Sequence, residues 1–256
     1  MKNNFVHLVF TSFTGRGIPG WKGQAWLDRR IKIFKEYTLQ SLINQTNRNF
    51  VHWVSWRAQE KRNTSVKKLG EYLTARNYPF VFTFGGLPIW DDRKSNERIE
   101  LRERLQKTLL DLIPILGEAK YCYQSILDSD DMLDKNAVQT VQNQTYGRKK
   151  AIGWTKGYVY NIETGQLAHW NTSTVPPFYT IMFPTDIFKD PEKHYNYIGP
   201  FRSHECVVHY FKFKNLSGRK FCVNVHGKNY TTAWDHPFRG KEITKNKNNI
   251  LSRFGI

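Results

Sequence analysis

Four short apolar segments recur in the first half of the chain, each rich in β-branched and aromatic residues. They span residues 5–13, 50–56, 79–84 and 121–127. Segments of this length and composition are typical of β-strands. The intervals between successive segments are long enough to hold a helix each. The pattern therefore predicts four strands that alternate with helices.

Two of these intervals show the helical period in their apolar positions. Within residues 31–45, one stripe is formed by Phe34, Thr38 and Leu42, and the pattern ends at the turn sequence TNRN. From Ser95 onward a second stripe is formed by Leu101, Leu105, Leu109 and Leu112. Pro114 and Gly117 are expected to end this helix. The alternation predicts an α/β fold with a Rossmann-like, mostly parallel sheet flanked by helices.

The helical period fades beyond residue 150, where three further segments have the composition of strands. They cover residues 151–161, 178–183 and 220–227, while residues 203–213 are compatible with either a helix or a strand. We expect this half to extend the sheet and to build the second wall of a cleft. No repeat, Gly/Ser linker or low-complexity block divides the chain, so a single domain over residues 1–256 is expected.

The chain is strongly basic, with 39 Lys and Arg against 22 Asp and Glu and a formal net charge of +17. We therefore expect an anionic partner, and nucleic acid, an anionic membrane surface and a phosphate-bearing substrate all meet this condition. A denser basic tail at residues 239–249 is expected to be solvated and mobile. Hydrophobic residues make up 39% of the chain, which excludes an intrinsically disordered protein.

Neither the N-terminus nor the cysteines indicate export. The apolar stretch near the N-terminus is short and has no cleavage site of small residues after it, and no other run approaches the length of a membrane span. Cys122, Cys206 and Cys222 are odd in number and lack CxxC spacing, so a disulfide framework or a zinc site is not expected. These features predict a soluble, cytoplasmic protein.

The strongest candidate for chemistry is the acidic segment LDSDD, which places Asp128, Asp130 and Asp131 directly after a predicted strand. Like charges this close raise one another's pKa unless a cation intervenes. In an extended segment Asp128 and Asp130 point to the same side. Oxygen ligands at a strand end suit Mn²⁺ or Mg²⁺, shared with the phosphate oxygens of a substrate. The alternative is a turn in which Asp131 or Asp134 caps the following helix.

Two segments together resemble a known family of enzymes. The helix and strand in EYTLQSLINQTNRNFVHWVSW, followed further along by LDSDD, are similar to family 2-like GT-A glycosyltransferases. Within that group the chain most resembles a bacterial rhamnosyltransferase family, whose C-terminal pattern is similar to CVNVHGKN and RFGI here. The resemblance implies a GT-A domain with a nucleotide-sugar-binding half at 1–134 and an acceptor-binding half at 135–256, the C-terminal extension of the fold.

The resemblance also implies roles for residues outside the acidic segment. It places Glu205 as the catalytic base of an inverting reaction, with His204 as the reserve candidate, and His226 as a further metal or phosphate ligand. The alternative for Glu205 is a structural one, in which Ser203 caps a helix and Glu205 favours its positive end. Thr11 and Phe13 would hold the nucleobase, since they follow the first strand.

Further candidates come from position and residue type. Arg16 and Arg57 follow predicted strands and are candidate phosphate contacts, as are Arg98 and Arg102, which lie one helical turn apart. Arg98 and Arg102 are equally compatible with a solvated charged face. Aromatic side chains often contact sugar rings, and the candidates for the acceptor site are Trp154, Tyr158 and Trp170. Core packing explains any of these three at least as well.

Together these features predict a metal-dependent glycosyltransferase that moves a sugar, with rhamnose as the candidate, from a nucleoside-diphosphate donor to a glycan or lipid-linked glycan. The basic surface would then allow peripheral contact with an anionic membrane at its inner face. One alternative is a basic nucleic-acid-binding protein, although the sequence contains no zinc finger, RNP-like motif or basic docking helix. The other is a metal-dependent phosphoryl-transfer enzyme, which would need further carboxylates for two metals.

Overall fold

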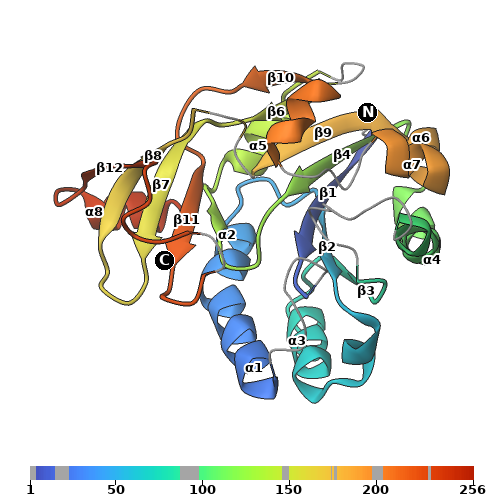
Figure 1. The fold of residues 1–256 in the computed structure, drawn as a ribbon, viewed down its shortest axis with the longest axis horizontal. Coiled ribbons are helices and arrows are strands. Elements are labelled where there is room, and N and C mark those ends of the chain that lie inside the picture. Colours follow the sequence, from blue (N-terminus) through green and yellow to red (C-terminus); the bar gives the residue numbers. More distant parts are fainter. Residues whose placement is uncertain are drawn as a thin grey trace.

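A seven-stranded sheet forms the centre of the computed structural model, with the strand order β10-β6-β9-β4-β1-β2-β3 (Figure 1). The model describes residues 4–14, 23–86, 98–145, 150–173, 175, 178–197, 204–229 and 232–256. The strands of this sheet are β1 (Phe5–Ser12), β2 (Val51–Ser55), β3 (Phe80–Thr83), β4 (Tyr121–Ile126), β6 (Lys150–Gly153), β9 (Tyr179–Pro184) and β10 (Lys212–Asn215). The first four confirm the strands predicted in the first half of the chain.

Most neighbours in this sheet run parallel. β1 pairs in parallel with both β2 and β4, and β2 with β3, so the carboxyl ends of these four strands lie at one edge. β9 is the exception, because it runs antiparallel between β4 and β6. This arrangement confirms the predicted α/β class with a mostly parallel sheet.

Helices cover both faces of the sheet, as the alternation of β1 side chains requires. Leu8 and Phe10 pack with Leu105, Leu109 and Leu112 of α4 (Arg98–Leu116), whereas Val9 belongs to the opposite cluster with Leu27 of α1. The helices on the α1 side are α1 (Gln24–Ile33), its continuation through a π-helical turn (Phe34–Thr38) and α2 (Leu39–Ile43), α3 (Thr64–Thr74) and α5 (Ala137–Gln142). The predicted helix at 31–45 is therefore the second part of a longer one.

The helix predicted from Ser95 to Pro114 differs slightly from α4. Residue 95 lies outside the described residues, and Pro114 stands inside the last turn of α4. The chain leaves the helix at Gly117, whose positive φ of 52° is the backbone conformation that favours glycine after a helix. Behind α4 lie the short helices α6 (Thr185–Lys189) and α7 (Pro191–Tyr197), which contact it. No helix in the described part of the chain is long and apolar enough to cross a membrane.

The second half of the chain extends this sheet with β6, β9 and β10, as predicted, and it also builds another sheet that was not predicted. This five-stranded sheet has the order β12-β8-β7-β11-β5. Its strands are β5 (Met132–Leu133), β7 (Lys156–Asn161), β8 (Leu167–Asn171), β11 (Phe221–Val225) and β12 (Arg239–Glu242). The predicted strand at 151–161 is therefore two strands, β6 and β7, that belong to different sheets.

Two other expectations for the second half need correction. The basic tail at 239–249 is not a purely solvated segment, because its first residues form β12 on β8 and its last begin α8 (Lys247–Ser252). The segment at 203–213 contributes a short 3₁₀ turn, η4 (His204–His209), and the start of β10. All three cysteines are free, as predicted.

Candidate functional site

The acidic segment forms a loop at the carboxyl end of β4, which lies between β1 and β9 in the sheet. The Leu127 amide donates to the Phe10 carbonyl at 3.0 Å, and Thr11 Oγ1 donates to the Leu127 carbonyl at 2.9 Å. These bonds fix the backbone immediately before Asp128. The Asp128 side chain is partly exposed, whereas Asp130 and Asp131 are buried. Residues 128–131 are called the acidic loop below.

Asp130 is the centre of a polar cluster drawn from distant parts of the chain. Its Oδ2 lies 2.9 Å from the NH1 of Arg30 on α1 and 3.1 Å from Nε2 of His226, which follows β11. The side-chain amide of Asn229 donates to the same oxygen at 3.3 Å, and its carbonyl accepts from the His226 amide at 2.7 Å. The predicted proximity of His226 to the acidic segment is thus present, together with Asn229.

Asp131 has a different role from its two neighbours, because its carboxylate faces β11. Its Oδ1 accepts from the backbone amide of Asn224 at 2.8 Å, and the Asn224 side chain donates to the Asp130 carbonyl. These bonds attach the acidic loop to the second sheet. The geometry therefore favours an anchoring role for Asp131 over the predicted role as a metal ligand.

Within the described part of the chain, the carboxylates of the acidic loop carry more negative charge than their surroundings neutralise. Burial and the neighbouring Asp130 raise the pKa of Asp128 to about 7, although Arg30 acts in the opposite direction. Burial, Asp130 and Asp128 also raise the pKa of Asp131. Burial alone would raise the pKa of Asp130, but Arg30 and His226 together bring it below its ordinary value. Among the described residues, Arg30 makes the one ion pair of Lys or Arg with this loop.

The donor set suits a divalent cation only if a substrate completes the coordination. No group of three His, Cys, Asp or Glu side chains in the described ranges is arranged to hold a metal alone. Asp128 and Asp130 nevertheless offer two adjacent carboxylates, and Mg²⁺ sites commonly use one or two carboxylates with substrate phosphates and water. Asp128 and Asp130 therefore fit a divalent cation whose remaining ligands come from a phosphate-bearing substrate and water.

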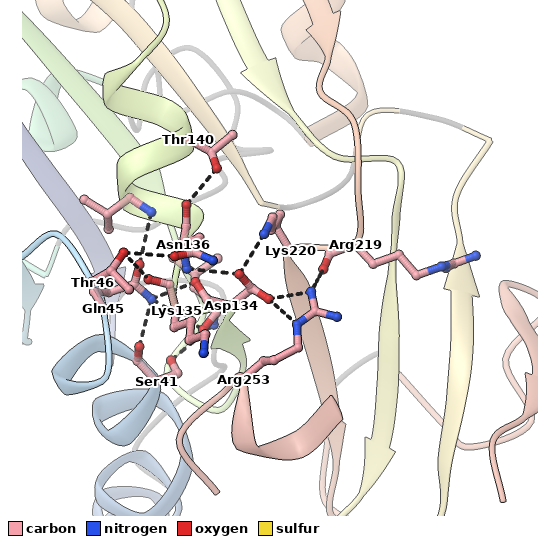
Figure 2. A network of polar contacts seen from close by, with 12 residues as sticks. Ser41, Gln45, Thr46, Asp134, Lys135, Asn136, Thr140, Arg219, Lys220 and Arg253 are labelled. Carbon is pink, nitrogen blue, oxygen red and sulfur yellow. Dashed lines mark hydrogen bonds and ion pairs between the residues drawn. The ribbon is translucent and has the colours of Figure 1, made fainter. Parts of the chain in front are cut away.

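A second buried cluster follows the acidic loop and is shown in Figure 2. The Asp134 carboxylate lies 2.9 Å from Lys220 Nζ and accepts from Arg253 Nε at 2.7 Å. Its Oδ1 also accepts from the Asn136 amide at 3.0 Å, just before α5. The bond from Asn136 to Asp134 resembles the predicted alternative in which Asp134 caps the helix that follows. Asp134 therefore has a structural role outside the acidic loop.

The two predicted nucleobase contacts have their side chains in the core. Thr11 and Phe13 are both fully buried, so neither presents side-chain surface to a ligand in this structure. Thr11 bonds the Leu127 carbonyl and the ring of His52, while Phe13 packs on Trp56 with ring centroids 4.2 Å apart. Both residues support the strand ends from within the core.

The predicted acceptor aromatics are also core residues. Trp154, Tyr158 and Trp170 are 3%, 6% and 4% exposed, which agrees with the packing alternative. Trp170 packs against His236 and Phe238, with ring centroids 4.8 and 5.8 Å apart. These two rings and nearby Trp234 are only partly buried, and no periodic pattern in the sequence distinguishes them from core aromatics.

The remaining candidates are placed only in part. Arg57 lines an open pocket with Gln59, Glu60, Arg62 and Asn63 beyond the carboxyl end of β2. Arg16 lies outside the described residues, and Arg98 and Arg102 lie on α4 with side chains that are not described. Their roles as phosphate contacts stay predictions.

The predicted catalytic pair lies on the short turn η4. Glu205 is exposed, and His204 Nδ1 donates to the carbonyl of Val175. Among the described residues, Glu205 makes no hydrogen bond or ion pair with the acidic loop. The predicted roles of Glu205 and His204 therefore rest on the resemblance.

Arg30 is the main site residue that the sequence did not predict. It comes from the segment LDRRIKIF, where Arg29 and Arg30 look like an ordinary charged face of a helix. In the structure Arg29 NH2 donates to the His226 carbonyl at 3.0 Å, and Arg30 contacts the acidic loop. Both arginines therefore join α1 to the site.

The chain matches no protein-family model and no curated protein. Among solved structures it is similar to the inositol-1-phosphate CTP transferase from T. maritima, with 10% sequence identity and a TM-score of 0.37. The similarity covers 88% of this chain and 87% of that one. A likeness of this size assigns no function, so the functional argument depends on the residues of the site.

Proposed function

We propose that the chain is a metal-dependent glycosyltransferase that uses a nucleotide-sugar donor. The observation that carries the proposal is the pair of adjacent carboxylates, Asp128 and Asp130, at the carboxyl end of β4 with Arg30 as their partner cation. Ligands of open α/β sheets bind at this edge. A loop that is short of positive charge, at the edge where phosphate-bearing ligands bind, suits a divalent cation with a diphosphate.

The chemistry follows from the charges of this site. Asp128 and Asp130 would hold Mn²⁺ or Mg²⁺, which would supply Lewis-acid neutralisation of the diphosphate leaving group. His226 and Asn229 contact Asp130 and hold its carboxylate in one orientation. The net charge of +17 also favours an anionic donor and an anionic, lipid-linked acceptor.

The proposal is tested first by binding. Thermal unfolding is followed with UDP-, GDP- and dTDP-sugars, each with and without Mn²⁺, because a ligand that binds the native state raises its stability. We expect one donor class to stabilise the protein only with Mn²⁺, and to be hydrolysed slowly. Asp128→Asn should abolish both effects, whereas Asp111→Asn, at an exposed position on α4, should change neither. Metal-independent, tight binding to DNA that Asp128→Asn leaves unchanged would contradict the proposal.

The proposed inversion depends on Glu205 and has its own test. Glu205→Gln should lower transfer by about 10²- to 10⁴-fold, the usual contribution of a general base, and donor binding with Mn²⁺ should persist. The anomeric configuration of the product is read by NMR. A retained configuration would contradict the role of Glu205 without affecting the metal and donor site.

A further inference from the structure

Arg30 makes two contacts with the acidic loop and lies beside His226. Its Nε donates to Ser129 Oγ at 2.9 Å, its NH1 lies 2.9 Å from Asp130 Oδ2, and the same NH1 lies 3.2 Å from His226 Nε2. The side chain is 15% exposed. The guanidinium therefore occupies one side of the carboxylate that we propose as a cation ligand.

The neighbouring arginine shows that α1 does not depend on Arg30 for its position. Arg29 donates to the His226 carbonyl at 3.0 Å and pairs with Glu163 at 3.2 Å. Buried apolar residues of the same helix, Leu27 and Ile31, pack in the core. The helix thus has other attachments, and the Arg30 side chain can move without the helix leaving its place.

A guanidinium and a divalent cation compete for the same carboxylate. Both are positive, and two cations held within a few ångströms of each other repel strongly in a partly buried site. The NH1 of Arg30 already lies 2.9 Å from Asp130 Oδ2, so the two cations would share one oxygen. A cation that binds Asp128 and Asp130 therefore weakens the interaction between Asp130 and Arg30.

We propose that Arg30 is an exchangeable counter-ion of the acidic loop. In the free protein it neutralises Asp130; when the cation binds, the guanidinium moves to the incoming diphosphate, for which its planar set of donors is suited. This inference rests on the proposed function. It adds a donor-binding residue whose position changes with the cation, and it makes cation and diphosphate binding depend on each other.

The first test measures Mn²⁺ binding alone by electron paramagnetic resonance. Arg30→Gln removes the competing cation, so we expect the affinity for Mn²⁺ to rise at least about fivefold, the lower range of typical coupling between two ligands. The control is Lys32→Gln, which removes one charge from the same helix at a largely exposed position paired with Glu36. It should leave the Mn²⁺ affinity within about twofold of wild type.

The second test uses inorganic pyrophosphate with saturating Mg²⁺, followed by calorimetry. Here Arg30→Gln should bind the anion at least about tenfold more weakly, since a charge-assisted contact is lost. Arg30→Lys keeps the positive charge but lacks the planar set of guanidinium donors, and it should recover part of the affinity for pyrophosphate. Exchange predicts that Arg30→Gln raises the affinity for the cation and lowers the affinity for the anion. A purely structural role of Arg30 would not produce these opposite effects.

The outcomes separate the two proposals. If wild type and Arg30→Gln both bind Mn²⁺ equally well, or the variant binds it more weakly, Arg30 orients Asp130 and the exchange is wrong, while the metal site stands. If neither binds Mn²⁺, the proposed function fails and the inference fails with it. If Arg30→Gln does not fold, NMR of the wild type replaces it. The Arg30 Nε–H resonance is assigned by its loss in Arg30→Lys, and we expect it to shift when Mg²⁺ and pyrophosphate are added. An unchanged resonance overturns the exchange.

Discussion

The buried carboxylate of Asp134 forms an ion pair with the partly exposed guanidinium of Arg253, with Nε at 2.7 Å and NH2 at 2.5 Å from the same oxygen (Figure 2). Asp134 has no exposed side-chain surface, and its other carboxylate oxygen forms an ion pair with Lys220. The Asp134 amide also donates to the Lys220 carbonyl at 2.9 Å. The pair therefore ties the last residues of the chain to the segment that follows the acidic loop.

Removing the charge of Asp134 should destabilise the protein strongly. Asp134→Asn leaves Arg253 and Lys220 without their buried partner. Both cations keep some contact with solvent, so we expect the free energy of unfolding to fall by about 3 kcal/mol, the lower end of the range for breaking a buried ion pair from one side. Urea denaturation at pH 7 measures the loss. Asp235→Asn, at an exposed position, is the matched control and should change stability by less than about 0.5 kcal/mol. If Asp134→Asn lowers the free energy of unfolding no more than Asp235→Asn does, the ion pair contributes little to stability.

Asp128→Asn should have the opposite effect on the metal-free protein. The substitution removes a carboxylate that repels Asp130 and Asp131, so we expect the free energy of unfolding to rise by about 1 kcal/mol at pH 8. The same variant should lose Mn²⁺ binding. Denaturation without metal and electron paramagnetic resonance with Mn²⁺ measure the two effects. If Asp128→Asn destabilises the metal-free protein, the acidic loop is better neutralised than the contacts of Arg30 indicate.

The sheet was predictable because its strands are short, apolar and separated by clear helical intervals. The acidic loop was predictable for a related reason, since it directly follows one of these strands. The split of 151–161 into β6 and β7 was not predicted, although Thr155 and Lys156 interrupt the apolar run where the chain changes sheets. The physical marks of the change are Gly153 and Gly157, each of which lies where a side chain would meet another residue.

The pairing of Arg30 with Asp130 could not be predicted, because it depends on the packing of α1 against two sheets. A basic residue on an amphipathic helix looks the same whether it faces solvent or a carboxylate. The aromatic residues could not be assigned for a similar reason: in the sequence, Trp154 and Trp170 suit a sugar site and a core equally, and the structure buries both. Sequence pattern identifies apolar side chains, but the sheet arrangement decides which of them a ligand can reach.

Two glycines should respond in opposite directions to alanine. A Cβ at Gly157 would lie 2.5 Å from the buried ring of Phe221, so Gly157→Ala should cost about 1–3 kcal/mol. A Cβ at Gly70, inside α3, would lie 3.5 Å from the ring of Phe82, an ordinary contact, so Gly70→Ala should add about 0.5–1 kcal/mol. Thermal and urea unfolding of both variants check the pair. Equal effects of the two substitutions would contradict the packing of β7 on β11.

The buried histidine His52 should make stability depend on pH. Its Nε2 contacts Thr11 Oγ1 at 3.0 Å and its Nδ1 accepts from the Tyr78 hydroxyl at 3.1 Å. Thr11 already donates to the Leu127 carbonyl, so the neutral ring donates through Nε2 and accepts through Nδ1. Burial lowers the pKa of His52 to about 3, and that of His7 likewise. Both rings are therefore neutral in the folded protein at pH 5.

The sign of the effect follows from proton binding in the two states. In the unfolded chain an ordinary histidine takes up a proton below about pH 6.5, whereas folded His52 does not, so stability falls as the pH drops toward 3. Between pH 7 and pH 5 each buried histidine should remove about 2 kcal/mol of the free energy of unfolding. The pH effect is measured as the difference between the free energies of unfolding in urea at pH 7 and pH 5. His52→Gln should reduce this difference by the contribution of one histidine. His209→Gln, at an exposed position, should leave the difference unchanged. A pH dependence that His52→Gln does not reduce would mean that His52 binds a proton in the folded state, and that the contacts around Thr11 rearrange when it does.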